Sequence, residues 1–210
     1  MIWNIVFDMG QVLIYFRPDS FLNRYEISDE EKQLLKREVF GSMEWPLLDW
    51  GALTDEQALE RMKPRIPASL HEIAGNLVRM WDRPIEPVQG MADLIRDLKE
   101  AGYGIYLLSN ASFRHPDYWG RIPGSEYFDG LVISAFEHMV KPNPDIYRCL
   151  LDRYDLRPEE CVFIDDMPTN VAGAYVAGMD GIVFRGVEEL RNELEKRGVN
   201  PGNASECCGK

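Results

Sequence analysis

Short, almost uninterrupted apolar runs recur along this chain, and stretches with helical periodicity lie between them. The runs cover residues 4–8, 104–110, 130–134, 161–165 and 181–184. Strands that are buried on both faces have such continuous runs, and their alternation with helices is typical of a parallel sheet. The helical face of the stretch 87–102 consists of Met91, Leu94, Ile95 and Leu98. The chain is therefore predicted to be an α/β protein with a parallel sheet and helices on both faces.

One long segment breaks this rhythm. Residues 17–87 contain no convincing strand, but they contain several helical patterns. Ser28 and Thr54 each precede acidic residues and an apolar periodic pattern, as N-cap residues do. We therefore expect an all-helical domain at 17–87, inserted into a catalytic core made of 1–16 and 88–200. The polar residues 201–210 are expected to form a flexible tail.

Composition restricts the partners of the chain. Its formal net charge is -12, whereas binding to a nucleic-acid backbone needs clustered Lys and Arg. No apolar run has the length of a bilayer span, and the first residues lack the basic region of a signal peptide. These features predict a cytoplasmic chain that acts on a small molecule, without a nucleic-acid or membrane partner. They do not indicate an oligomeric state.

Polar side chains stand where the predicted strands end. Asp8 ends the first run, Ser109 ends the second, and Asp165 and Asp166 end the fourth, while Lys141 follows the third. The carboxyl ends of parallel strands form the functional crevice of an open α/β sheet. Three carboxylates in one crevice repel each other unless a cation is present, and oxygen ligands favour Mg²⁺.

This set of residues suits phosphoryl transfer. Asp8 is a candidate carboxylate nucleophile that attacks phosphorus and forms an aspartyl-phosphate. Mg²⁺, Lys141 and Ser109 would hold the other phosphoryl oxygens, where charge must be stabilised.

Four motifs resemble those of the haloacid dehalogenase superfamily, in order and along nearly the whole chain. They are "FDMGQV", "LLSN", "VKPNPDIY" and "FIDDMPTNVAGA". The resemblance implies a Rossmann-like core with a type 1 cap, and a magnesium-dependent phosphatase. It implies that Asp8 is the nucleophile, that Ser109, Asn110 and Lys141 bind phosphate, and that the metal ligands are Asp8, the Gly10 carbonyl, Asp165 and Asp166.

The first motif departs from the usual phosphatase pattern. Phosphatases of this superfamily usually have a second Asp, the general acid and base, where this chain has Gly10. Loss of a positioned acid costs about 10²–10⁴-fold in rate for a poor leaving group. We therefore expect a good leaving group, such as an anomeric phosphate, or a substitute acid. His115 is the candidate for this acid and for a substrate-binding residue. The glycine and the sequence "LSN…RH" are similar to bacterial sugar-phosphate phosphatases of the alpha-glucose-1-phosphate type and to the phosphatase domain of epoxide hydrolases.

Two other functions remain open at this point. Dehalogenases of the superfamily also lack the second Asp, so hydrolysis of a carbon–halogen bond is one alternative. The other is a non-catalytic protein that binds a phosphorylated metabolite. Asn170 is expected to orient Asp166, and the sequence leaves open whether Trp45, Trp50 and Trp81 line a pocket or pack between helices.

Overall fold

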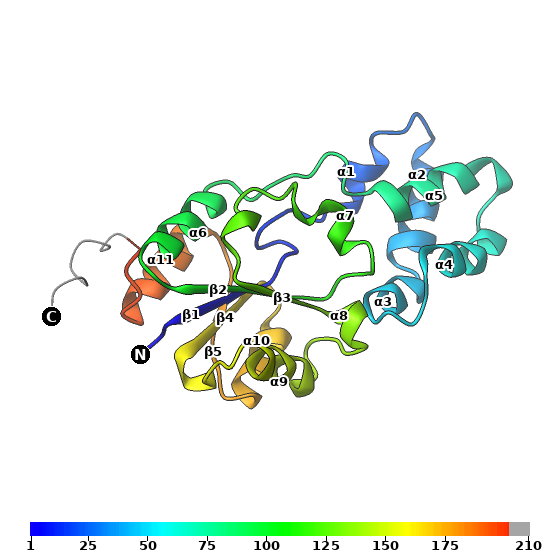
Figure 1. Ribbon diagram of the computed structural model, residues 1–210. Helices are drawn as coiled ribbons and strands as arrows, with labels where there is room; N and C mark the ends of the chain where they lie inside the picture. The colour runs from blue at the N-terminus through cyan, green and yellow to red at the C-terminus, as the bar shows by residue number, and fades with distance from the viewer. Residues whose placement is uncertain (202–210) are drawn as a thin grey trace, which may run out of the picture.

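A five-stranded parallel sheet forms the centre of the computed structural model, which describes residues 1–201 (Figure 1). The strand order is β3-β2-β1-β4-β5. The strands are β1 (Asn4–Phe7), β2 (Gly104–Ser109), β3 (Gly130–Ile133), β4 (Cys161–Asp165) and β5 (Asp180–Val183). All five apolar runs are therefore confirmed as strands. The predicted flexible tail lies outside the described residues, except for Pro201.

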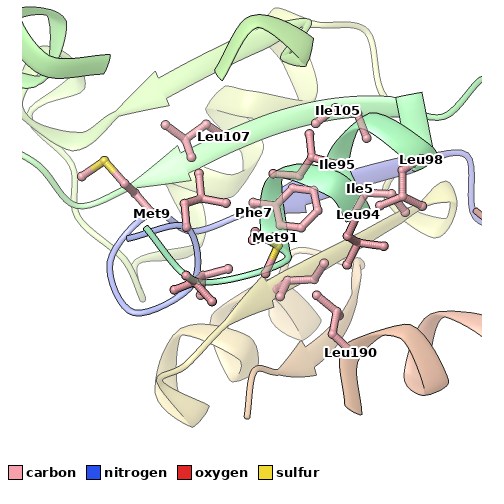
Figure 2. Close-up of a cluster of buried hydrophobic side chains, with 14 of the residues drawn as sticks. Ile5, Phe7, Met9, Met91, Leu94, Ile95, Leu98, Ile105, Leu107 and Leu190 are labelled. Atoms are coloured by element: carbon pink, nitrogen blue, oxygen red, sulfur yellow. The ribbon is translucent and has the colours of Figure 1, made fainter. Parts of the chain in front are cut away.

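Helices cover both faces of the sheet. On one face lie α6 (Met91–Glu100) and α11 (Val187–Lys196), and on the other lie α9 (Pro144–Arg153) and α10 (Pro168–Val176) (Figure 1). Successive side chains of a strand point to opposite faces. Accordingly, Phe7 packs in the α6 cluster shown in Figure 2, whereas Val6 packs with Tyr147 of α9. The predicted α/β class with a Rossmann-like core is confirmed.

The first helix face that the sequence predicts is correct in detail. Met91, Leu94, Ile95 and Leu98 are all at most 1% exposed and lie under the sheet. Gly102, which follows this helix, has φ +91°, a conformation that favours glycine.

All regular elements between β1 and α6 are helical, and they lie beyond the carboxyl edge of the sheet (Figure 1). Ser28 and Thr54 both form the predicted N-caps, each as a complete capping box. The last helix of this region begins at His71, after a 3₁₀ turn. The elements are α1 (Pro18–Leu22), α2 (Asp29–Leu35), the π-helix η1 (Lys36–Phe40), α3 (Glu44–Asp49), α4 (Asp55–Met62), the 3₁₀ helices η2 (Lys63–Arg65) and η3 (Ala68–Leu70), and α5 (His71–Met80).

These helices have a hydrophobic core of their own, in which Leu35, Leu59 and Met62 are at most 2% exposed. A separate core is what an independently packed unit requires. The division into 1–16 and 88–200 against 17–87 stays a prediction, and we call residues 17–87 the helical segment.

The helical segment contacts the sheet domain at the end of α3. Trp50 Nε1 donates a hydrogen bond of 2.6 Å to the carbonyl of His138, and Ser134 Oγ donates to the carbonyl of Asp49. Gly51 has φ +71°, and a Cβ atom there would lie 2.1 Å from the carbonyl oxygen of Ala135. The backbone at Gly51 thus lies directly against α8 (Ser134–Glu137). Only glycine fits this approach.

A second contact lies near the end of the segment. The Asp82 carboxylate is 0% exposed and accepts hydrogen bonds from Arg121 and, at 3.0 Å, from Arg114. Both arginines flank α7 (His115–Trp119), a helix that the sequence did not predict. Within residues 1–201, no helix is both long enough and apolar enough to cross a bilayer.

Candidate active site

Asp8 and Lys141 meet at the carboxyl edge of the central strand. Asp8 directly follows β1, and its amide donates a 2.8 Å hydrogen bond to the carbonyl of Ile164 in β4. Lys141 Nζ lies 2.7 Å from Asp8 Oδ1 and 2.7 Å from Asp165 Oδ2. Burial raises the pKa of Asp8 to about 6, although the charge of Lys141 opposes this shift. The lysine thus pairs with two buried carboxylates and compensates one of their two charges.

Hydrogen bonds from several groups fix the carboxylate of Asp165. Its carboxylate is 0% exposed and accepts hydrogen bonds from the Met167 amide at 2.8 Å and from Asn170 Nδ2 at 3.1 and 3.0 Å. The prediction that Asn170 orients Asp166 is therefore wrong, because its amide binds Asp165. The side chain reaches back across the first turn of α10 to the buried carboxylate.

Three carboxylates at this edge can share a cation. Asp8, Asp165 and Asp166 each offer an oxygen, and these atoms lie within 4.8 Å of one another. Asp8, Gly10 and Asp166 also line a cavity at this edge, whereas Asp165 does not. The donors are all oxygens, which is the set that Mg²⁺ prefers. The residues present therefore fit the predicted ion, with Asp166 as the accessible member of the acidic pair.

The predicted phosphate-binding residues lie beside this centre. Asn110 Oδ1 accepts the Lys141 amide at 2.9 Å, and Asn110 Nδ2 donates to the Lys141 carbonyl at 3.2 Å. Asn110 therefore positions the lysine, and it also lines the cavity. Ser109 Oγ is buried, with no hydrogen-bond partner among the described residues. A buried hydroxyl without a protein partner calls for an explanation, and a ligand oxygen would supply one, although Ser109 itself does not line the cavity.

The cavity has a volume of about 220 Å³ and lies between the sheet edge and the helical segment. Aromatic rings form one of its walls. The centroid of Phe16 lies 5.5 Å from Trp45 and 5.1 Å from Trp81, and the centroid of Trp81 lies 5.2 Å from Tyr118. Trp45 and Trp81 thus both line the cavity and pack together, whereas Trp50 lies outside the cavity, 47% exposed.

His115 occupies a different place from the one its candidate role requires. It is 2% exposed, it stacks on Trp119 with a centroid distance of 5.1 Å, and it does not line the cavity. Its Nε2 atom is buried without a hydrogen-bond partner in the described part of the chain. Burial lowers the pKa of His115 to about 4, so the ring is neutral at physiological pH. We therefore assign it no catalytic role.

One residue of this cavity was missed at the level of the sequence. Asp49, the last residue of α3, lines the same cavity as Asp8. Burial and the negative charge of Asp8 raise the pKa of Asp49 to about 8. The sequence offered only a weak signal, an acid between two leucines and a tryptophan, since α3 itself was not predicted.

A parallel α/β sheet with a carboxylate, an ammonium and an acidic pair at one edge is typical of hydrolases that work through an aspartyl intermediate. The family model of haloacid dehalogenase-like hydrolases matches residues 4–178. The chain therefore belongs to this family, as its four motifs indicate.

Two curated relatives and one solved structure are similar to the chain. The sesquiterpene phosphatase of Aspergillus oryzae is 29% identical over 84% of this chain and 87% of its own length. The bifunctional epoxide hydrolase 2 of Rattus norvegicus is 29% identical over 85% of this chain, which spans only 33% of that enzyme. An enzyme of the same superfamily from Bacteroides thetaiotaomicron, solved with magnesium and inorganic phosphate, has a TM-score of 0.68 at 20% identity and covers 89% of this chain and 96% of its own. At that identity it supports the fold alone.

Proposed function

We propose that the chain is a magnesium-dependent phosphatase that hydrolyses a small phosphorylated metabolite through an aspartyl-phosphate on Asp8. The observation that carries this proposal is the set of groups around Asp8: Lys141 at 2.7 Å, two further carboxylates within 4.8 Å and the unpartnered hydroxyl of Ser109 nearby. The resemblance to the sesquiterpene phosphatase of Aspergillus oryzae supports it.

Each residue around Asp8 has its own role in the proposed reaction. Asp8 uses its second carboxylate oxygen, because Oδ1 accepts the Lys141 hydrogen bond. Lys141 holds Asp8 in place and offers its charge to the phosphoryl group, and Ser109 offers its hydroxyl. Asp8, the Gly10 carbonyl and Asp166 would hold the ion, and Asp165 would orient Lys141. Bound Mg²⁺ would neutralise the charge that develops on the transferred phosphoryl oxygens.

The leaving group would lie against the aromatic wall. A sugar ring has apolar faces that pack on aromatic side chains such as Trp45 and Trp81, so the proposed substrate remains a sugar phosphate. A second candidate is a phosphate monoester with an apolar chain. The four rings along the cavity and the resemblance to a sesquiterpene phosphatase favour it.

Phosphate release from a small substrate panel tests the proposal. The panel contains glucose 1-phosphate, glucose 6-phosphate and farnesyl monophosphate, each with Mg²⁺ or with EDTA, and 2-chloropropionate as the dehalogenase control. We expect phosphate release that EDTA stops and that added Mg²⁺ restores. The ester that is hydrolysed faster, a glucose phosphate or farnesyl monophosphate, identifies the class of leaving group. Halide release that survives EDTA, or no phosphate release at all, would contradict the proposal.

A further inference from the structure

The departure of a leaving alkoxide needs a proton that Gly10 cannot supply. A Cβ atom built on Gly10 would meet no atom within 4 Å, and the residue lines the cavity. The glycine is therefore not required by crowding, and the space that an acidic side chain would occupy is open. Another group must reach this space if the substrate has a poor leaving group.

Among the acids of the helical segment, Asp49 is the best candidate to supply this proton. It lines the cavity that Asp8 and Gly10 also line. Within residues 1–201 its carboxylate has no hydrogen-bond or ion-pair partner, so no protein group competes with a ligand for its oxygen atoms. Asp55, a second acid of the helical segment on this cavity, differs because it lies 3.7 Å from Arg114. Burial raises the pKa of Asp55 too, but the Arg114 charge opposes this rise and stabilises the ionised form, whereas Asp49 has no such partner among the described residues.

The backbone around Asp49 is fixed to the sheet domain. The Asp49 carbonyl accepts a hydrogen bond from Ser134, the next residue binds the His138 carbonyl, and Gly51 lies against Ala135. These three contacts are consecutive along the chain. They fix the backbone at Asp49 against α8, with Asp49 lining the cavity.

We propose that Asp49 protonates the leaving oxygen and then activates the hydrolytic water, in place of the acidic side chain that Gly10 lacks. This inference rests on the proposed phosphatase function. As Asp8 forms its bond to phosphorus, the bond from phosphorus to the leaving oxygen breaks, and the Asp49 proton goes to that oxygen. The Asp49 carboxylate then takes a proton from water as the water oxygen attacks phosphorus and the bond from the Asp8 oxygen to phosphorus breaks. Inorganic phosphate and free Asp8 result, and Asp49 is again protonated.

The surroundings of Asp49 favour the protonated starting form. Its raised pKa, about 8, means that most molecules carry the proton at neutral pH. The ionisable groups that share the cavity with it are Asp8, Asp55, Tyr118, Lys141 and Asp166. Lys141 opposes the shift, whereas burial and Asp8 cause it. The fixed position of Asp49 on α3 and its raised pKa therefore both support its role as the proton donor.

Two esters of similar size and different leaving groups test this role. Benzyl phosphate releases a basic alkoxide, which needs a proton, whereas 4-nitrophenyl phosphate releases a stable phenolate. We expect Asp49→Asn to lower kcat/KM for benzyl phosphate by about 10²–10⁴-fold. For 4-nitrophenyl phosphate we expect less than about a tenfold change, because kcat/KM reports only the steps up to loss of the leaving group.

Asp55→Asn is the matched control, an acid on the same cavity that has an arginine partner. It should change kcat/KM for the two esters by the same factor. Retained hydrolysis of 4-nitrophenyl phosphate by Asp49→Asn also shows that this variant is folded. Equal losses on both esters, or no loss on benzyl phosphate, would overturn the role of Asp49. A wild-type protein inactive on both esters would instead refute the phosphatase function itself.

Discussion

Lys141 Nζ lies 2.7 Å from Asp8 Oδ1, although 133 residues separate the two in the chain. The same ammonium lies 2.7 Å from Asp165 Oδ2, and the side chain of Lys141 is 1% exposed. One cation thus joins the ends of β1 and β4 and holds the proposed nucleophile in a fixed orientation. Stability and catalysis should therefore both depend on it.

We predict that Lys141→Met lowers both the free energy of unfolding and the rate of phosphate release. Two buried carboxylates lose their shared cation, which costs about 3 kcal/mol of the free energy of unfolding. Phosphate release should fall by at least about 100-fold, since a group that stabilises the transition state is also lost. Urea unfolding in the presence of EDTA and phosphate release with Mg²⁺ measure the two effects.

Lys99→Met is the control for this variant. Lys99 pairs with Asp129 at the surface, where the two side chains are 34% and 35% exposed, so its loss should cost less than about 1 kcal/mol. Equal destabilisation by the two substitutions would contradict the central position of Lys141.

Contact between α3 and α8 should be needed for activity. In Gly51→Ala the new methyl group would lie 2.1 Å from the Ala135 carbonyl oxygen, so the helical segment must move away from the sheet domain. We expect kcat/KM to fall by at least about tenfold, because the catalytic groups lose their alignment. Gly102→Ala is the control. Its φ of +91° carries similar backbone strain, but its Cβ would meet no atom within 4 Å. If Gly51→Ala and Gly102→Ala lower kcat/KM equally, backbone strain rather than the contact between α3 and α8 explains the loss.

His115 should make the protein sensitive to mild acid. Its pKa is about 4 in the folded protein and close to 6.5 in the unfolded chain, so unfolding takes up a proton between these values. Stability that depends on a neutral His115 is present above the unfolded pKa and is lost as pH falls. The loss amounts to about 2 kcal/mol between about pH 7 and pH 5.

Urea unfolding of wild type and His115→Gln at both pH values measures this contribution. The free energy of unfolding of the wild type should fall by about 2 kcal/mol more than that of the variant over this pH range. The comparison cancels other titrating groups. An identical pH dependence of the two proteins would show that His115 becomes protonated without unfolding.

The sheet domain was largely predictable, because each strand has an apolar run and parallel strands bring their carboxyl ends together. Asp8, Lys141, Asp165 and Asp166 could thus be placed at one edge from the sequence. The sequence could not show that Asn170 binds Asp165 rather than Asp166, because the two acids are adjacent. Side-chain direction after β4 decides this, and only the structure contains it.

The helical segment was less predictable at its contact with the sheet. Helix α3 has no side-chain N-cap and contains Pro46, so no local signal marks it. Its Asp49 looks like any solvated acid until α3 lies against α8. His115 was misleading for a different reason, since its ring packs on Trp119 within α7, a short helix that the sequence did not predict, and not on the cavity. A contact between distant segments decides the position of Asp49, and a local contact decides that of His115.

Phosphate release by Asp8→Asn tests the account most directly. Asparagine keeps the size of the side chain but is a poor nucleophile, so the aspartyl-phosphate cannot form. The proposed mechanism predicts a fall in kcat of at least about 10³-fold with Mg²⁺ present, in a variant that remains folded. Phosphate release within about tenfold of the wild type would show that Asp8 is not the nucleophile, and the proposed mechanism would then be wrong.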